Sequence, residues 1–174
     1  MDAYYLEITR GAFYLYMILL LTAAITDIWK FIIPNLISLA VIALFVALAL
    51  LQPFPIPWGS HVGAAALFFA GGLLLYRFNI LGAGDVKLLT ALSLWAGFGH
   101  LADLLLGVAL CGGGLAVALI VGRRIFFSLV LLGSAPEQRS IPRVLVQGEP
   151  VPYGVGIAAG GIWLGSKLPI FGFF

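Results

Sequence analysis

Apolar runs that are long enough to enter a lipid bilayer follow one another along almost the whole chain, and they restrict the folds available to it. Of the 174 residues, 63% are hydrophobic and 9% are charged, whereas a soluble domain carries about 25% charged residues. In lipid every backbone polar group must find its partner inside the protein, and helices achieve this. The sequence therefore predicts one integral-membrane domain, residues 1–174, built as an all-α bundle of six transmembrane helices. The expected spans are residues 11–25, 36–51, 61–76, 86–98, 101–121 and 151–164.

The segments outside these spans differ in character. The first ten residues carry two acids and one base, so the first span is expected to be retained, because a cleaved signal peptide starts with a positive region. Arg123-Arg124 ends the fifth span. The apolar residues 125–132 are too few to cross a bilayer, since a spanning helix needs about 20 residues. We expect an interfacial or re-entrant piece there, followed by a polar loop at residues 133–150.

Basic residues are distributed unevenly between the two sides of the predicted bundle. If the chain crosses the membrane six times, alternate loops share a side, and seven of the nine bases fall on one side together with the loop 133–150. Arg10 and Lys167 fall on the other side. The positive-inside rule makes the seven-base side cytoplasmic and both termini external. Asp27 ends the first helix and Asp85 begins the fourth, so both are expected at the cytoplasmic end. The seven bases are Lys30, Arg77, Lys87, Arg123, Arg124, Arg139 and Arg143.

Asp27 and Asp85 are acids placed at the edge of apolar runs, where a charge is costly. A charged side chain within a membrane helix costs about 2.5–3.5 kcal/mol on insertion scales. Two carboxylates at one depth are expected to share one proton, because two negative charges in a low-dielectric bundle repel each other. One carboxyl group could then act as a base for water and the other as an acid, as in aspartic proteases. Gly82 and Gly84 would allow another peptide to approach closely.

Each of these aspartates also has a structural interpretation. Asp27 could extend to the membrane interface beside Lys30, and Asp85 could cap the fourth helix, since aspartate is a favoured N-cap residue. Asp103 also stands near a helix start, but the topology places it on the outer side. We therefore interpret Asp103 as structural.

Other residues that could hold a metal are few and scattered. His61 and His100 fall on the outer side and are interpreted as interfacial polar residues. The single cysteine, Cys111, can form neither an intrachain disulfide nor a cysteine cluster for zinc. We therefore expect no metal and no other cofactor. The sparse basic residues also indicate no nucleic-acid partner.

Three motifs in this chain resemble those of the type IV prepilin peptidases, which are aspartic proteases with six to eight membrane helices. Residues 82–88, GAGDVKL, resemble the GxGD signature of that family. Thr26-Asp27, followed by Ile33-Pro34-Asn35, resembles its first catalytic aspartate and the Ile-Pro-Asn that trails it. Residues 151–154, VPYG, are similar to the proline-aromatic-glycine segment before its last helix.

This resemblance covers about residues 11–165 and implies an activity. Asp27 and Asp85 would be the catalytic pair, and the substrate would be a membrane-inserted prepilin precursor. Cleavage would occur on the cytoplasmic side of the substrate's membrane helix, after a glycine that ends a short basic leader. The protein would then be a multi-pass protein of the bacterial inner membrane with periplasmic termini. The other motif residues expected near the substrate are Gly82, Gly84, Lys87, Pro152, Tyr153 and Gly154.

Longer members of the family also methylate the new N-terminus and carry a cytoplasmic domain with paired cysteines between the first two helices. Here only a few residues separate Asp27 from Pro34, and the chain has one cysteine. Methyltransferase activity and zinc are therefore not carried over. The short form resembles the peptidases of Tad/Flp-type pili or of archaeal preflagellins, and we favour the former.

Two further functions remain as alternatives. The aspartates could relay protons in a small proton-coupled transporter, because buried acids often serve that role. The chain shows no internal repeat, however, and many transporters have one. It could also be a structural subunit of a secretion machine in which the aspartates only cap helices. Cleavage of a pilin precursor by the purified protein would separate these functions.

Overall fold

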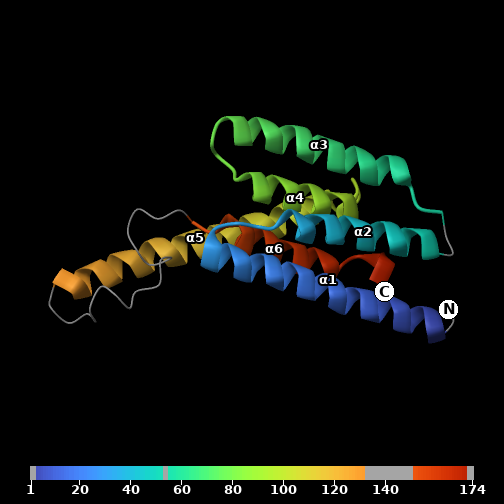
Figure 1. Cartoon of the computed structure of the whole chain (residues 1–174), viewed down its shortest axis with the longest axis horizontal. Helices are drawn as coiled ribbons and strands as arrows, with labels where there is room; N and C mark the ends of the chain where they lie inside the picture. The colour runs from blue at the N-terminus through green and yellow to red at the C-terminus, as the bar shows by residue number, and fades with distance from the viewer. Residues whose placement is uncertain (1–2, 53–54, 132–150, 172–174) are drawn as a thin grey trace.

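The computed structural model describes residues 3–52, 55–131 and 151–171, and the regular structure in these ranges is entirely helical (Figure 1). The predicted all-α class is therefore confirmed for the described residues. A short 3₁₀ helix follows the last α-helix. In chain order the elements are α1 (Ala3–Lys30), α2 (Asn35–Leu51), α3 (Trp58–Arg77), α4 (Ala83–Ala96), α5 (Leu101–Leu131), α6 (Tyr153–Gly165) and η3 (Pro169–Phe171).

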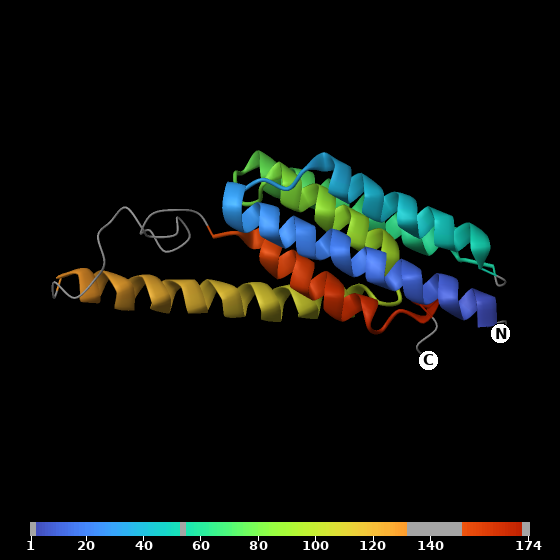
Figure 2. The same ribbon diagram turned by 60° about the horizontal axis from the view of Figure 1, so that its bottom comes forward.

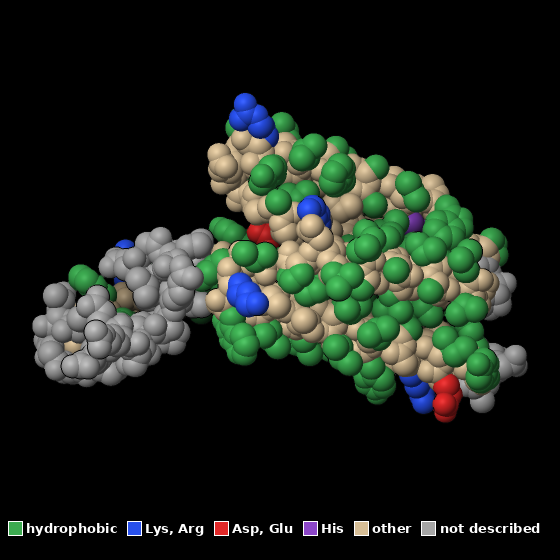
Figure 3. Space-filling view, in the orientation of Figure 1, with side chains coloured by type: hydrophobic (Ala, Val, Ile, Leu, Met, Phe, Trp, Pro, Cys, Tyr) green, Lys and Arg blue, Asp and Glu red, His purple; other side chains and the backbone are tan. Residues whose placement is uncertain are grey.

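Length and surface chemistry are those of a membrane protein. In the described part of the chain, three helices are long and apolar enough to cross a bilayer: Tyr4–Lys30, Trp58–Arg77 and Leu101–Leu129. Helices α2 and α6 are also apolar but have 17 and 13 residues. Hydrophobic side chains are spread along the visible face of the molecule, and charged ones gather near its two ends (Figure 3). Six transmembrane helices remain a prediction.

Helix α4 lies in the middle of the bundle, between α3 and α2 (Figure 1). It packs against α2, α3, α5 and α6, and α3 packs mainly on α4. Nearly every side chain in its second half is buried. The sequence explains this position, because residues 91–96 of α4 are apolar except for Ser93, and a helix that is apolar on most sides is stable only when it is enclosed.

Four aromatic side chains lock the helices together around α4. The indole ring of Trp95 stacks on Phe171 of η3, with 5.1 Å between ring centroids, and contacts Tyr16 and Phe45. The polar atoms of these rings bond to backbone. The Tyr16 hydroxyl donates to the carbonyl of Gly161 at 2.8 Å, and the Trp95 N–H donates to the carbonyl of Val41 at 3.0 Å. Buried aromatic rings thus join α1, α2, α4 and α6 without leaving a polar atom unpaired.

Helix α5 extends well beyond the other helices (Figure 2). The prediction that the fifth helix ends at Arg123-Arg124, with a separate piece at residues 125–132, is wrong, because α5 continues without interruption to Leu131. Charged side chains leave backbone hydrogen bonds intact, and no proline breaks this stretch. The expected loop 133–150 lies outside the described residues.

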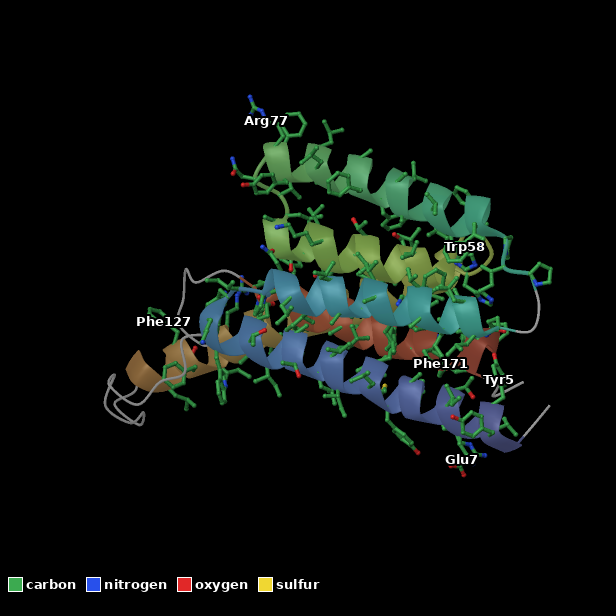
Figure 4. All side chains as sticks on the ribbon, turned by 45° about the vertical axis from the view of Figure 1, so that its right-hand side comes forward. Tyr5, Glu7, Trp58, Arg77, Phe127 and Phe171 are labelled. Carbon is green, nitrogen blue, oxygen red and sulfur yellow. The ribbon has the colours of Figure 1, made fainter. Side chains whose placement is uncertain are left out.

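Several helix ends meet at one end of the bundle. There α1 and α3 end, and α2, α4 and α6 begin, whereas both chain termini lie at the opposite end (Figure 1). We call the first the aspartate end, formed by residues 27–35, 77–85 and 151–155, and the second the terminal end. Arg77 lies at the aspartate end of α3 and Trp58 at its terminal end (Figure 4). Asp27 and Asp85 thus share one end of the bundle, as the sequence predicts.

Candidate active site

Asp27 lies in the last turn of α1 and points into the protein. Only 6% of its surface is exposed, whereas the neighbouring Ile28, Trp29 and Lys30 are exposed. The interpretation of Asp27 as a residue that reaches the interface beside Lys30 is therefore wrong. A carboxylate in this position needs compensation from the protein, since burial of an unpaired charge is costly.

The start of α6 faces the Asp27 carboxylate. The backbone N–H groups of Gly154 and Val155, in the first turn of α6, lie beside it, and that of Val155 also donates to the Pro152 carbonyl oxygen at 3.2 Å. Its Oδ2 atom nevertheless has no hydrogen-bond partner of standard geometry among the described residues. The N-terminus of a helix favours nearby negative charge through its free N–H groups and its dipole. Pro152, the N-cap residue, is fully buried and anchors this helix start.

Only a glycine fits at position 154, because the α6 backbone lies so close to the Asp27 carboxylate. A Cβ atom at residue 154 would lie 2.8 Å from Asp27 Oδ2 and 2.6 Å from Ile33 Cδ1. Real Cβ atoms essentially never come so close to another heavy atom. The glycine in the VPYG segment therefore lets the α6 backbone reach the carboxylate.

Asp85 occupies the third position of α4, and Gly82 is the N-cap residue. The Gly82 N–H donates to Asp85 Oδ2 at 3.2 Å. The capping interpretation is thus correct in that the carboxylate bonds the helix start, but Asp85 does so from inside the first turn. The side chain is half-buried and lies within electrostatic range of Asp27. Capping and membership of a two-aspartate site are therefore compatible.

The turn between α1 and α2 joins the two aspartates. Phe31 has a φ of 52°, which reverses the chain directly after α1. Ile33 is consequently turned inward and buried. A Cβ atom on Gly84 would lie 3.1 Å from Ile33 Cβ and 3.3 Å from its carbonyl oxygen. Ile33 therefore packs between Gly84 of α4 and Gly154 of α6, so that one side chain sets the spacing of both motifs.

A second link between α2 and α4 lies beside this turn. Pro34 is the N-cap residue of α2, with an extended backbone. Asn35 follows it, and its Oδ1 atom accepts a hydrogen bond from Lys87 Nζ at 2.8 Å. The Ile-Pro-Asn segment thus contributes a buried wedge, a helix start and an interhelical hydrogen bond in three successive residues.

Both aspartates open onto one cavity of about 250 Å³. Half of its lining residues come from the end of α1 and the turn after it, and half from residues 82–85 at the start of α4. A recess that holds an acidic side chain, with basic ones above and below it, is visible at the left side of the bundle in the space-filling view (Figure 3). The backbone of the GAGD segment is accessible in the cavity because its glycines carry no side chains. The lining residues are Asp27, Phe31, Ile32, Ile33, Gly82, Ala83, Gly84 and Asp85.

The predicted motif residues fall into two groups. Gly82 and Gly84 line the cavity, whereas Lys87, Pro152, Tyr153 and Gly154 do not. Lys87 lies further along α4 than the cavity residues, and Pro152, Tyr153 and Gly154 form the start of α6. The Tyr153 side chain is half-exposed. Sequence reasoning did not assign Phe31, Ile32, Ile33 or Ala83 to the site, although Ile33 and Ala83 stand within two of the quoted motifs. An apolar side chain gives no chemical hint that it lines a cavity.

The terminal end holds Asp103 and both histidines. Asp103 accepts from Lys167 Nζ at 2.9 Å and pairs with His100 Nδ1 at 3.2 Å. His61 Nδ1 lies 2.7 Å from the Leu94 carbonyl oxygen. These contacts join helix ends far from the two-aspartate cavity, which agrees with a structural role for Asp103. Among the described residues, no group of three or more His, Cys, Asp or Glu side chains could hold a metal ion.

Comparison with known proteins places both aspartates within a recognised sequence family. The family model described as the type IV leader peptidase family matches residues 14–117. The chain is also 28% identical, over 145 residues, to the prepilin leader peptidase/N-methyltransferase of Bacillus subtilis (strain 168). That alignment covers 83% of this chain and 50% of the relative, so the chain spans about half the length of the curated protein that it matches. No solved structure is significantly similar to the chain.

Proposed function

Because the chain belongs to the type IV leader peptidase family, we propose that it is an aspartic endopeptidase that removes the leader peptide from prepilin precursors. The observation that most supports this proposal is that Asp27 and Asp85 line one cavity, beside the accessible backbone of the GAGD segment. The B. subtilis relative, whose name states a prepilin leader peptidase, supports this substrate class. The precursor of a Flp-type pilin is the proposed substrate, and no metal or other cofactor is needed.

The chemistry follows from two carboxyl groups that share one proton. The ionised carboxylate takes a proton from water, and the hydroxide so formed bonds to the carbonyl carbon of the scissile peptide. The protonated carboxyl group donates its proton to the carbonyl oxygen. Collapse of the tetrahedral intermediate breaks the C–N bond, and a proton passes to the leaving amine. A substrate strand beside Gly82 and Gly84 would place its carbonyl group within reach of both aspartates.

We place the aspartate end at the cytoplasmic face of the bacterial inner membrane, with six spans and both termini in the periplasm. Lys30, Arg77 and Lys87 lie at this end, and the projecting half of α5 carries Arg123 and Arg124 toward the same side (Figure 2). Such an excess of basic residues is typical of cytoplasmic loops. The site would then meet the basic leader of the substrate on the side where that leader is held.

Labelling of single cysteines in whole cells tests this orientation. In a Cys111→Ala background, Ile80→Cys should react only with reagents that cross the membrane, and Ile56→Cys should react with impermeant ones. The opposite pattern would place the aspartate end outside and would separate the site from a cytoplasmic leader.

Cleavage by the purified chain tests the proposed activity. The chain in detergent should convert a membrane-inserted Flp-type precursor into one product, and mass spectrometry should locate the new N-terminus directly after the glycine that ends the leader. A precursor of an archaeal preflagellin, assayed in parallel, compares the two substrate classes. An intact precursor, together with proton-driven uptake by reconstituted vesicles, would show that the aspartates serve transport.

A further inference from the structure

A groove runs along the outside of the bundle between α2 and α3, with α4 as its floor. Helices α2 and α3 both pack on α4 (Figure 1), and this leaves a space of about 470 Å³ between them. We call it the α2–α3 groove. Its wall is largely apolar. The lining residues are Asn35, Leu36, Ser38, Leu39, Ile42, Phe69, Lys87 and Thr90.

The α2–α3 groove begins where the catalytic cavity ends. Residues 31–33 and 82–85 line the cavity. Asn35 and Lys87, which are hydrogen-bonded to each other at 2.8 Å, are the next lining residues along both chain segments and belong to the groove. The two spaces therefore follow each other along both segments, with the Asn35–Lys87 hydrogen bond at their border. A segment in the groove would have its end at the aspartates.

The direction of the groove follows the helix axis. Four of its residues, at positions 35, 38, 39 and 42, recur at the spacing of one face of α2. They extend over about 10 Å from the aspartate end toward the middle of the bundle, given a rise of about 1.5 Å per residue. The side chains of Leu36 and Leu39 are exposed. The groove is therefore an apolar, membrane-facing surface that leads to the catalytic cavity.

Ser38 indicates what kind of molecule fills this groove. Only 4% of its surface is exposed, and its Oγ atom has no hydrogen-bond partner among the described residues. Thr90, by contrast, donates to the Val86 carbonyl oxygen at 2.8 Å. A lipid chain offers no partner for a serine hydroxyl, whereas a closely packed helix offers backbone carbonyl groups and small polar side chains. The Ser38 hydroxyl is enclosed in the free bundle and would meet an occupant by turning its side chain into the groove. A helix offers it a partner there, and this favours a helix as the occupant.

We propose that the α2–α3 groove binds the membrane helix of the substrate, with its cytoplasmic end at Asn35 and Lys87. The proposal rests on the proposed function, since a leader peptidase must hold a substrate whose cleavage site adjoins a membrane helix. Binding of that helix would place the scissile bond at the cavity through the shared border. The groove would thereby select membrane-inserted precursors over soluble peptides of the same local sequence.

Cross-linking tests where the helix lies. In an Asp85→Asn, Cys111→Ala background, Leu39→Cys should form a disulfide with a cysteine in the first turns of the precursor's membrane helix. Leu21→Cys is the matched control, because Leu21 is an exposed leucine of α1 (48% exposed, against 61% for Leu39) at a similar distance from the aspartate end. Equal cross-linking at both positions, or cross-links at position 39 only between two copies of the chain, would overturn the proposal.

The second test fills the α2–α3 groove with a larger side chain and measures substrate preference. Leu39→Trp should lower the ratio of kcat/KM for the full precursor to kcat/KM for a short peptide around the cleavage site. We expect a fall on the order of tenfold, as overpacking of a binding surface costs about one such factor. Leu21→Trp should keep the wild-type ratio. Identical ratios for both variants would overturn the groove as the docking site, whereas failure of the wild type to cleave either substrate would overturn the proposed function itself.

Discussion

Gly154 of α6 lies against the carboxylate of Asp27 so closely that any side chain at position 154 would collide with it. A Cβ atom there would meet Asp27 Oδ2 at 2.8 Å. The two residues come from opposite ends of the chain, and their contact brings the first turn of α6 to the candidate catalytic acid. The last helix is therefore part of the site although it contributes nothing to the cavity lining.

We expect Gly154→Ala to abolish most activity. The added methyl group must displace either the α6 start or the carboxylate, and a displacement of about 1 Å in a catalytic group can cost about 100-fold in rate. Initial rates of precursor cleavage measure the effect. Gly71→Ala in α3 is the control, because a Cβ atom at residue 71 meets nothing within 4 Å. That variant should cleave normally, and equal rates for the two variants would show that the close contact has no role.

The aspartates should behave as one unit. Asp27→Asn and Asp85→Asn each keep the size of the side chain but remove its titrating proton, so each should lower the cleavage rate by about 10²–10⁴-fold. The double variant should be no worse than either single one, because members of a catalytic unit are strongly non-additive. Asp103→Asn, at the terminal end, should cleave nearly normally. Additive losses in the double variant would argue for two independent roles.

Most of the helices could be predicted because their signals are local. Apolar runs and loop charges located the spans and placed Asp27 and Asp85 at a common end. The predicted stop at Arg123-Arg124 failed because charge does not end a helix when no residue interrupts its backbone hydrogen bonds. The helix boundary near Leu131 therefore could not be derived from the position of the arginines.

The inner construction of the site could not be predicted in the same way. Ile33 packs between two glycines of different helices, and nothing in its local sequence shows either contact. The resemblance supplied the Ile-Pro-Asn and VPYG segments as motifs but no physical reason for them. That reason depends on how α1, α4 and α6 pack, which is a property of the assembled bundle.

The activity should depend on pH with a bell-shaped profile. Two carboxyl groups that share one proton are active only when one is ionised and the other protonated. At low pH the base becomes protonated, and at high pH the acid loses its proton, so the rate falls on both sides. Steady-state cleavage rates across a pH series, with circular dichroism to exclude unfolding, measure the profile. A rate that rises to a plateau would indicate a single essential group.

Cleavage should be independent of metal ions. The proposed mechanism needs only carboxyl groups and water, and Cys111 is partly buried in α5 away from the cavity. Activity should therefore persist in an excess of chelator and in Cys111→Ala. Loss of cleavage on chelation that is restored by zinc would instead indicate a metal-activated water.

Ser38→Ala tests the groove through two effects of opposite sign. Without substrate, the change removes a buried hydroxyl that has no partner among the described residues. An unsatisfied buried polar group costs about 1–3 kcal/mol, so thermal unfolding in detergent should show a more stable protein. With substrate, the same change removes a hydrogen-bond donor to the bound helix, so KM for the full precursor should rise while kcat stays close to the wild-type value.

Ser93→Ala is the matched control for this prediction. Ser93 is also a buried serine near the groove, but its hydroxyl donates to the Thr90 carbonyl oxygen at 2.8 Å. Its removal should therefore destabilise the protein by about 1 kcal/mol and leave KM unchanged. If Ser38→Ala stabilises the protein without any change in KM, the hydroxyl does not contact the substrate, and the groove must hold its helix through apolar contacts alone. If Ser38→Ala instead destabilises the protein as Ser93→Ala does, its hydroxyl has a partner in the free bundle, and the argument for a helix in the groove loses its main support.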